Sequence, residues 1–562
     1  MKLNRIHRII ETVSSRVVLI SFSLQAILLL KVAPLQIDPH HDGVILGAAI
    51  AASTGHLGPA GAFSQYGPLN PLIQGLFLRV FGNSMINLRY FAALNVICIS
   101  ILLFKLVKKI SNSHSALIVS TLWVCTSAIW STSFPGALLA WPSLISTGLT
   151  LGGLYLLLNY ISSNLNSYRK PHWPIFVSGI LIGLSGFARQ QAWLAIPLAV
   201  LSLVLSNRGL HRNIIHFISG VAFALGCMLT WLVVIGSWQD YVNQVFIWPL
   251  TAYSTLGATN NYNRYQFFSY IIEALVFIVA VLVVAKLQAR IKWRVASIGL
   301  ALLFTLIITI DGFWISQQAN WKASIRVVLG EPQEKILISF SYFSALAVLI
   351  YCAYYFFSKK FREFIVSPVE ISIAFFGLVG VVQLYPQPDV LHLWWVAPLF
   401  IPGGLIAFKK LSQKFSGFPE RSFYTTLNIF SMVGIIFAIQ FMNRSWIEYE
   451  IPVLKGTYAL SDKVNAVNKF NLVRNQIIPG ETSFDCADGI YAVSDGSYSP
   501  PDEWFVNWGM LKMDKSALGK VRIICNQSLE YATRESQRLG WNLKYYEKSN
   551  YGDISFAVLV QP

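Results

Sequence analysis

This sequence contains few charged residues. Only 12% of its 562 residues are charged, whereas a soluble protein carries about a quarter. Hydrophobic residues make up 55% of the chain, and the mean hydropathy is +0.54. This composition excludes an ordinary soluble globular protein and predicts a polytopic membrane protein. A Gly-Lys-Ser/Thr phosphate loop is also absent, so the sequence gives no sign of an ATP site.

Carboxylates are the scarcest charged groups, and only twelve of the 26 precede residue 443. Two of them, Asp38 and Asp42, lie within five residues in Ile-Asp-Pro-His-His-Asp-Gly, directly after the first long apolar segment. Because an ionised carboxylate is costly next to hydrocarbon, we interpret this pair as a reaction centre facing water at the membrane surface. The alternative is a turn and a helix N-cap, which Asp-Pro and Asp-Gly often form.

Thirteen apolar segments have roughly membrane-spanning length. They lie at 17–33, 86–104, 115–130, 143–161, 174–188, 191–206, 214–235, 267–285, 295–312, 336–357, 368–384, 394–408 and 423–442. Alternate connections hold 22 of the 43 basic residues, the others hold eight, and 13 follow residue 442. The positive-inside rule then predicts a cytoplasmic N-terminus that stays as a signal anchor, and it places the first loop, 34–85, outside. It also explains the net charge of +17 without a nucleic-acid partner.

The composition changes near residue 443, after which fourteen acidic and thirteen basic residues accompany no spanning segment. Strands are predicted at 520–525, 541–546 and 554–560, with a helix at 529–539. We therefore expect an all-α membrane domain over 1–442 and a small soluble α/β domain over 443–562. In an oxidising extracytoplasmic compartment, Cys486 and Cys525 of this tail could pair.

The other outer loops are rich in polar side chains: Arg189, Gln190 and Gln191 at a membrane turn, Lys322 and Arg326, then Asp389 and His392. Carboxylates can take a proton from a hydroxyl, and cations stabilise charge on a phosphate, so this set suits a substrate with a phosphate leaving group.

Less specific interpretations stand beside these. Arg189 could anchor a helix end at the headgroups. Lys322 and Arg326 could bind lipid, and Asp389 with His392 could form a local pair. The first loop could hold a divalent metal through its adjacent histidines and its carboxylates: His40, His41, Asp38 and Asp42. Trp394-Trp395 is interpreted as part of an interfacial aromatic belt.

Five features follow one another along the chain. The first outer loop contains Asp residues, and Tyr66-Gly-Pro-Leu with an amphipathic stretch over 69–81 comes next. A Gly-rich helix ending in Arg189-Gln190, a late Pro-x-x-Asp-x-x-His and a soluble tail complete the order. This layout resembles the GT-C membrane glycosyltransferases, near the protein mannosyltransferase and lipid A aminoarabinose transferase branch of glycosyltransferase family 39. The resemblance covers about residues 1–442.

The resemblance implies sugar transfer from a polyprenyl-phosphate donor to a glycan, lipid or protein hydroxyl on the periplasmic face of the inner membrane, usually with inversion. Asp42 is the closest match to the family's essential first-loop acid, and Asp38 is second. Arg189, Lys322 or Arg326 would hold the phosphate, and Tyr66, Gln190, Asp389 and His392 complete the substrate contacts. No cofactor is required, although a divalent metal could participate. We expect Asp42→Asn to abolish transfer while the protein stays folded.

Two other classes of function remain open. A flippase or transporter of lipid-linked glycans would place ionisable residues at mid-membrane depth and show repeated halves. An O-antigen-type polymerase or ligase would rely on an Arg- and His-rich loop late in the chain.

Overall fold

The structure is a computed structural model. It describes residues 2–35, 39–57, 64, 66–130, 138–163, 172–206, 210–247, 271–272, 274–284, 332–358, 367–384, 390–414, 420–442, 447–451, 456–460, 475–476, 478, 482–485, 520–525, 528–547 and 556–562. Outside these residues lie Asp38, Lys322, Arg326, Asp389, Cys486 and the segment predicted at 295–312, together with the side chains of His40 and Cys525.

Within the described ranges, seven helices are long and apolar enough to cross a membrane. They are α1 (Lys2–Val32), α4 (Met85–Ile110), α6 (Pro142–Ser163), α9 (Leu210–Val234), α15 (Pro332–Phe357), α18 (Val390–Lys414) and α19 (Glu420–Met442). The chain is therefore a multi-pass membrane protein, as the composition predicts.

Shorter apolar helices coincide with further predicted segments. They are α5 (Ser113–Cys125), α7 (Trp173–Ala188), α8 (Ala195–Ser206) with the preceding 3-10 helix η2 (Gln190–Leu194), Ala274–Val284, and α17 (Pro368–Gln383). Every predicted segment within the described ranges thus corresponds to a helix, and the number of membrane crossings stays a prediction.

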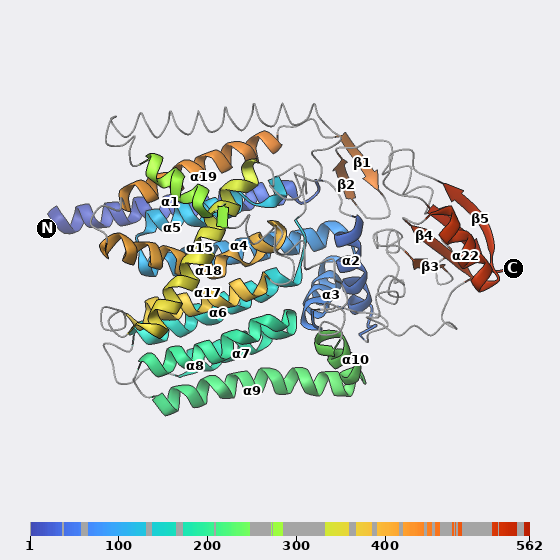
Figure 1. Ribbon diagram of the computed structural model, residues 1–562, viewed down its shortest axis with the longest axis horizontal. Helices are drawn as coiled ribbons and strands as arrows, with labels where there is room; N and C mark the ends of the chain where they lie inside the picture. The colour runs from blue at the N-terminus through green and yellow to red at the C-terminus, as the bar shows by residue number, and fades with distance from the viewer. Residues whose placement is uncertain are drawn as a thin grey trace.

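The helices lie side by side in a bundle (Figure 1), with α7 between α6 and α9, and α18 against α15 and α17. Glycine lets α7 and α9 approach closely, because a Cβ at Gly179 would lie 2.2 Å from the Phe217 carbonyl oxygen. Such small-residue contacts are typical of helix pairs in membranes, where no hydrophobic force drives helices together.

The first loop folds into two short helices, α2 (Pro39–Ser53) and α3 (Leu69–Phe81), which pack on each other. Helix α3 confirms the amphipathic stretch predicted at 69–81. It buries Asn70, Gln74 and Leu78, while Leu76 and Val80 are 66% and 69% exposed. Together with α10 (Trp238–Val242) and the π-helix η3 (Asn243–Ile247), these helices lie at the end of the bundle away from the N-terminus (Figure 1).

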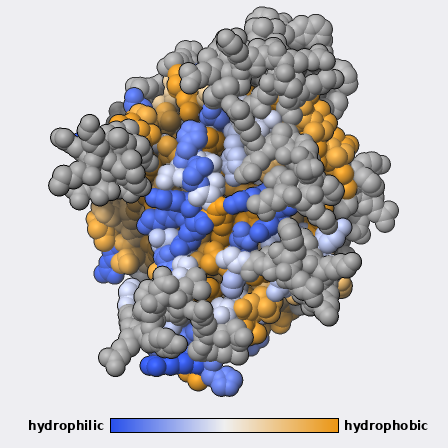
Figure 2. Space-filling view, turned by 90° about the vertical axis from the view of Figure 1, so that its left-hand side faces the viewer, coloured by the Kyte–Doolittle hydropathy of each residue, from blue (hydrophilic) through white to orange (hydrophobic). Residues whose placement is uncertain are grey.

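Basic residues predicted to be cytoplasmic meet at the opposite end. Helix α4 starts beside α3 and, at 26 residues, is about 39 Å long, which is enough to cross the bilayer before Ile110. There the Lys409 Nζ donates to the Ile110 carbonyl at 3.4 Å, and Lys410 pairs with Glu370 at 3.1 Å. Figure 2 shows hydrophilic side chains across this end, flanked by hydrophobic ones.

The tail forms two sheets. Strands β1 (Ile447–Ile451) and β2 (Gly456–Leu460) pair antiparallel. A second sheet has the order β3-β4-β6-β5, where β3 (Thr482–Asp485) runs parallel to β4 (Val521–Cys525), and β6 (Phe556–Val560) runs antiparallel to β4 and to β5 (Asn542–Glu547).

Helix α22 (Leu529–Leu539) packs on β5 and β6. Ser528 caps its start, and Gly540, at φ 68°, ends it. The predicted helix at 529–539 and the strands near 521, 542 and 556 are confirmed, whereas β1, β2 and β3 are not predicted. The sheets lie beyond the same end of the bundle as α2 and α3 (Figure 1).

Candidate active site

Asp42 lies in the first turn of α2 and forms a bidentate ion pair with Arg89 of α4. The Arg89 Nη2 donates to Oδ2 at 2.5 Å, and Nε donates to Oδ1 at 3.2 Å. The two residues are buried, with 3% and 1% of their surfaces exposed. Planar bidentate pairing of this kind fixes both groups in position.

Arg89 also binds two backbone carbonyls from the segment between α1 and α2. Its Nη1 donates to the carbonyls of Ala33 and Leu35, at 3.1 and 2.8 Å, just after α1 ends. Carbonyls at a helix end lack intrahelical partners, so one guanidinium satisfies them while it binds the acid. Arg89 is not singled out from the sequence for this role. An arginine at the fifth position of an apolar helix was the available signal.

A second group of side chains, the aromatic cluster, comprises His41, Tyr66, Trp141, His392 and Trp395. The Trp141 ring lies 5.3 Å from His41, 5.7 Å from Tyr66 and 5.2 Å from Trp395, and His392 lies 5.1 Å from Trp395. These residues come from α2, the turn before α3, the segment before α6, and the start of α18. Three predicted site residues, His41, Tyr66 and His392, are thereby brought together.

The same cluster corrects one interpretation. Trp394 and Trp395 are both fully buried, so they do not form an interfacial belt. Helix α18 presents them inward, where Trp394 stacks on Trp123 at 5.8 Å and Trp395 stacks on Trp141. Their side chains therefore line the interior of the bundle.

Arg189 ends α7 and is enclosed, with 1% of its surface exposed. Its guanidinium donates to the Ser143 hydroxyl, to the Gln383 carbonyl at 2.6 Å and to Gln191 Oε1 at 3.3 Å. It also lies over the Tyr66 ring, 5.6 Å from the centroid. A side chain held this way does not reach the headgroups, which excludes the simple anchoring role. The guanidinium instead contacts Tyr66 of the first loop.

Glycine explains why Tyr66 meets Arg189. Gly67 has φ 137°, and a Cβ there would lie 2.1 Å from the Phe187 carbonyl oxygen. Only glycine lets the loop approach the end of α7 this closely, two residues before Arg189. Beside them, Gln190 Nε2 lies at hydrogen-bond distance, 3.5 Å, from the Val245 carbonyl.

Of the four candidate metal ligands in the first loop, the structure describes the side chains of Asp42 and His41. Both Asp42 oxygens accept from a guanidinium, whose positive charge opposes a second cation, and the His41 ring packs against Trp141. In the described part of the chain, no three His, Cys, Asp or Glu residues are grouped as ligands would be.

Together these contacts define a buried acid, two buried cations and an aromatic cluster at one end of a helical membrane bundle. Residues 65–234 match the family model of dolichyl-phosphate-mannose-protein mannosyltransferases. The matched range includes Tyr66, Arg89, Trp141 and Arg189. It confirms the resemblance inferred from the sequence and supports a glycosyltransferase. No curated protein sequence matches the chain.

Solved structures of two proteins are similar in overall extent. The Archaeoglobus fulgidus oligosaccharyltransferase, in complex with Zn and sulfate, shares 11% identity at a TM-score of 0.47, covering 95% of this chain and 72% of that one. ArnT from Cupriavidus metallidurans in the apo state shares 12% identity at a TM-score of 0.45, covering 97% and 98%. ArnT bound to undecaprenyl phosphate gives the same identity and TM-score. Because these scores lie below 0.5, we base no functional inference on them.

Proposed function

We propose that this protein transfers a sugar from a polyprenyl-phosphate donor to an acceptor hydroxyl, at the end of the bundle that holds α2 and α3. One observation carries the proposal. An acid and a cation from distant parts of the chain lie close to one aromatic side chain, Trp141. The Trp141 ring contacts His41, which directly precedes Asp42, and it contacts Tyr66, whose ring lies under the guanidinium of Arg189. The match to a family named for a polyprenyl-phosphate sugar supports this donor class.

The reaction needs a base and a stabilised leaving group. The acceptor hydroxyl gives its proton to a carboxylate while its oxygen bonds to the anomeric carbon. The bond from that carbon to the phosphate oxygen breaks, and its electron pair leaves with the lipid phosphate. Attack opposite the leaving group inverts the anomeric configuration. Cations near the phosphate stabilise the charge that develops on it, and no general acid is needed.

We assign the base to Asp42. Arg89 donates one hydrogen bond to each carboxylate oxygen, which holds the carboxylate in a fixed orientation close to the aromatic cluster. Asp38, four residues earlier, is the second candidate. Arg189 supplies a buried positive charge toward the phosphate, and Lys322 and Arg326 remain proposed phosphate contacts. We assign substrate contacts to Gln190, Asp389 and His392.

The proposed orientation places this end outside the plasma membrane and the N-terminus in the cytoplasm. The clustered basic ends of α4 and α18, at Lys108, Lys109, Lys409 and Lys410, lie at the opposite end and support it. A flippase is less well supported, because the buried charges Asp42, Arg89 and Arg189 lie at helix ends or close to them.

The test uses purified protein in lipid nanodiscs with radiolabelled polyprenyl-phosphate mannose, glucose or aminoarabinose and a panel of acceptors. We expect release of polyprenyl phosphate together with labelled acceptor. Asp240→Asn is the matched control, since it removes an exposed carboxylate at the same end of the bundle. In proteoliposomes, movement of intact labelled donor between leaflets without release would instead identify a flippase.

A further inference from the structure

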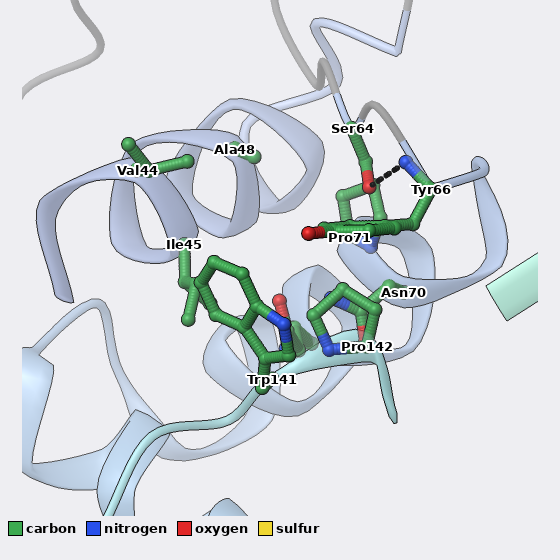
Figure 3. A pocket seen from close by; sticks show the side chains of 10 residues that line it. Val44, Ile45, Ala48, Ser64, Tyr66, Asn70, Pro71, Trp141 and Pro142 are labelled. Carbon is green, nitrogen blue, oxygen red and sulfur yellow. Dashed lines mark hydrogen bonds between the residues drawn. The ribbon is translucent and has the colours of Figure 1, made fainter. Parts of the chain in front are cut away.

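A small cavity lies between α2, α3 and the segment before α6 (Figure 3). The residues that line it include Val44 and Ile45 of α2, Asn70 and Gln74 of α3, and Trp141 before α6. The cavity is partly open and has a volume of about 30 Å³. Ile45 follows Asp42 by three residues, about one helical turn, so the cavity adjoins the proposed base.

Three residues that line this cavity carry polar atoms that are unpaired among the described residues. Within the described part of the chain, Asn70 Oδ1, Gln74 Oε1 and Trp141 Nε1 are buried and have no hydrogen-bond partner. The three residues are 3%, 1% and 7% exposed. The Gln74 Nε2 donates to the Ala140 carbonyl at 2.5 Å. This hydrogen bond fixes the orientation of the amide, whose Oε1 has no partner among the described residues. Proteins rarely bury such atoms unpaired, and three beside one cavity point to a ligand that pairs with them.

The chemistry of the wall limits that ligand. Two amide oxygens accept and one indole N–H donates, which suits a hydroxyl that can do both. No charged side chain lines the cavity among the described residues, so a phosphate or carboxylate has no counter-charge there. The volume has room for a hydroxyl or hydroxymethyl group, and the Trp141 and Tyr66 rings beside it provide flat apolar surfaces for a sugar ring.

We propose that Asn70, Gln74 and Trp141 form a subsite that binds a hydroxyl-bearing arm of a sugar ring. This inference rests on the proposed function, since the sugar belongs either to the donor or to a glycan acceptor. Both sources present the same neutral hydroxyl chemistry, and the experiment separates them.

The variants are Asn70→Leu and Trp141→Phe, and Trp394→Phe is the control. Trp394 is also buried and also has an indole N–H without a hydrogen-bond partner among the described residues, but it does not line the cavity. Removing an unpaired buried polar atom does not lower stability through hydrogen bonding, so Asn70→Leu should keep the thermal unfolding midpoint. A structural role would instead lower the midpoint.

The first readout is saturation-transfer NMR of the nanodisc protein with methyl mannoside, methyl glucoside and their 6-deoxy analogues. We expect both subsite variants to weaken binding of one glycoside about tenfold, the equivalent of one good hydrogen bond. They should no longer distinguish it from its deoxy analogue, while the Trp394→Phe control behaves as wild type. Binding unchanged by either subsite variant, a lowered unfolding midpoint in Asn70→Leu, or absence of glycoside binding by the wild type would each overturn the subsite.

The second readout is turnover. A raised KM for donor in donor hydrolysis assigns the subsite to the donor sugar, and a raised KM for the acceptor alone assigns it to the acceptor. If the wild type binds a glycoside and the subsite variants lose it, yet no donor is turned over, the subsite stands and the proposed transferase function fails.

Discussion

The ion pair between Asp42 and Arg89 makes the simplest mutational test misleading. Asp42→Asn removes the carboxylate that pairs with a guanidinium that is only 1% exposed, and breaking a buried pair from one side costs about 3–5 kcal/mol. A folded domain is stable by only about 5–15 kcal/mol. We therefore expect Asp42→Asn to lower stability as well as transfer, which revises the expectation from sequence that this variant stays folded.

A double variant separates catalysis from folding. In Asp42→Asn with Arg89→Gln, two neutral amides replace the two paired charges. We expect this protein to be more stable than Asp42→Asn alone, because the two substitutions couple strongly, but less stable than wild type, because the carbonyls of Ala33 and Leu35 lose the hydrogen bonds from Arg89. The measurement is denaturant unfolding in nanodiscs for wild type, both single variants and the double variant.

Transfer by the double variant then decides the role of Asp42. If it is the base, the folded double variant transfers about 100- to 10,000-fold more slowly than wild type. A folded double variant with near-normal transfer would refute the assignment and leave Asp42 as an anchor for α2. In that case Asp38 becomes the candidate base, and Asp38→Asn should abolish transfer. If Asp42 is the base, we expect transfer by Asp38→Asn to stay measurable.

Three further outcomes are expected. Arg189→Lys keeps the charge but loses the planar contact with the Gln383 carbonyl, so donor turnover should fall at least tenfold; an unchanged rate would remove Arg189 from the site. Transfer should persist in EDTA, because Asp42 is already engaged by Arg89; loss restored by a divalent cation would contradict this. In the tail, partial burial works to raise the pKa of Glu535, but hydrogen bonds from Arg538 and Arg522 outweigh it and hold the pKa below its usual range. The carboxylate thus stabilises α22 above its ordinary pKa, and this contribution is lost as the pH falls through the lower folded value. The protection factors of the α22 amides, which are corrected for the intrinsic exchange rate at each pH, should fall in acid, and Glu535→Gln should remove that pH dependence.

Hydropathy predicts the long apolar helices correctly, because it arises locally. A span must be apolar over about 20 residues whatever it packs against, so the helices of spanning length within the described ranges fall where the sequence predicts them. The strand and helix near 521 and 529 likewise follow from short-range pattern and from the Ser528 and Gly540 caps. Asp42, Tyr66 and Arg189 could be singled out because polar groups at a membrane surface are scarce.

Their partners could not be predicted, because a partner depends on contacts across long sequence separations. The side chain that binds Asp42 lies 47 residues away, and the carbonyl that binds Arg189 lies 194 residues away. Trp394 and Trp395 have the composition of an interfacial belt, and only helix packing turns them inward.

By itself, the sequence determined that this chain is a helical membrane protein, and it singled out Asp42 as one of few acids in the first 442 residues. Only the tertiary structure decided that Asp42 is paired with Arg89, and that two residues of α3 whose amide oxygens lack a partner in the described part of the chain line a cavity near it. The physical reason is that hydrophobicity is carried by each residue, whereas the pairing of a buried polar atom is a property of its neighbours.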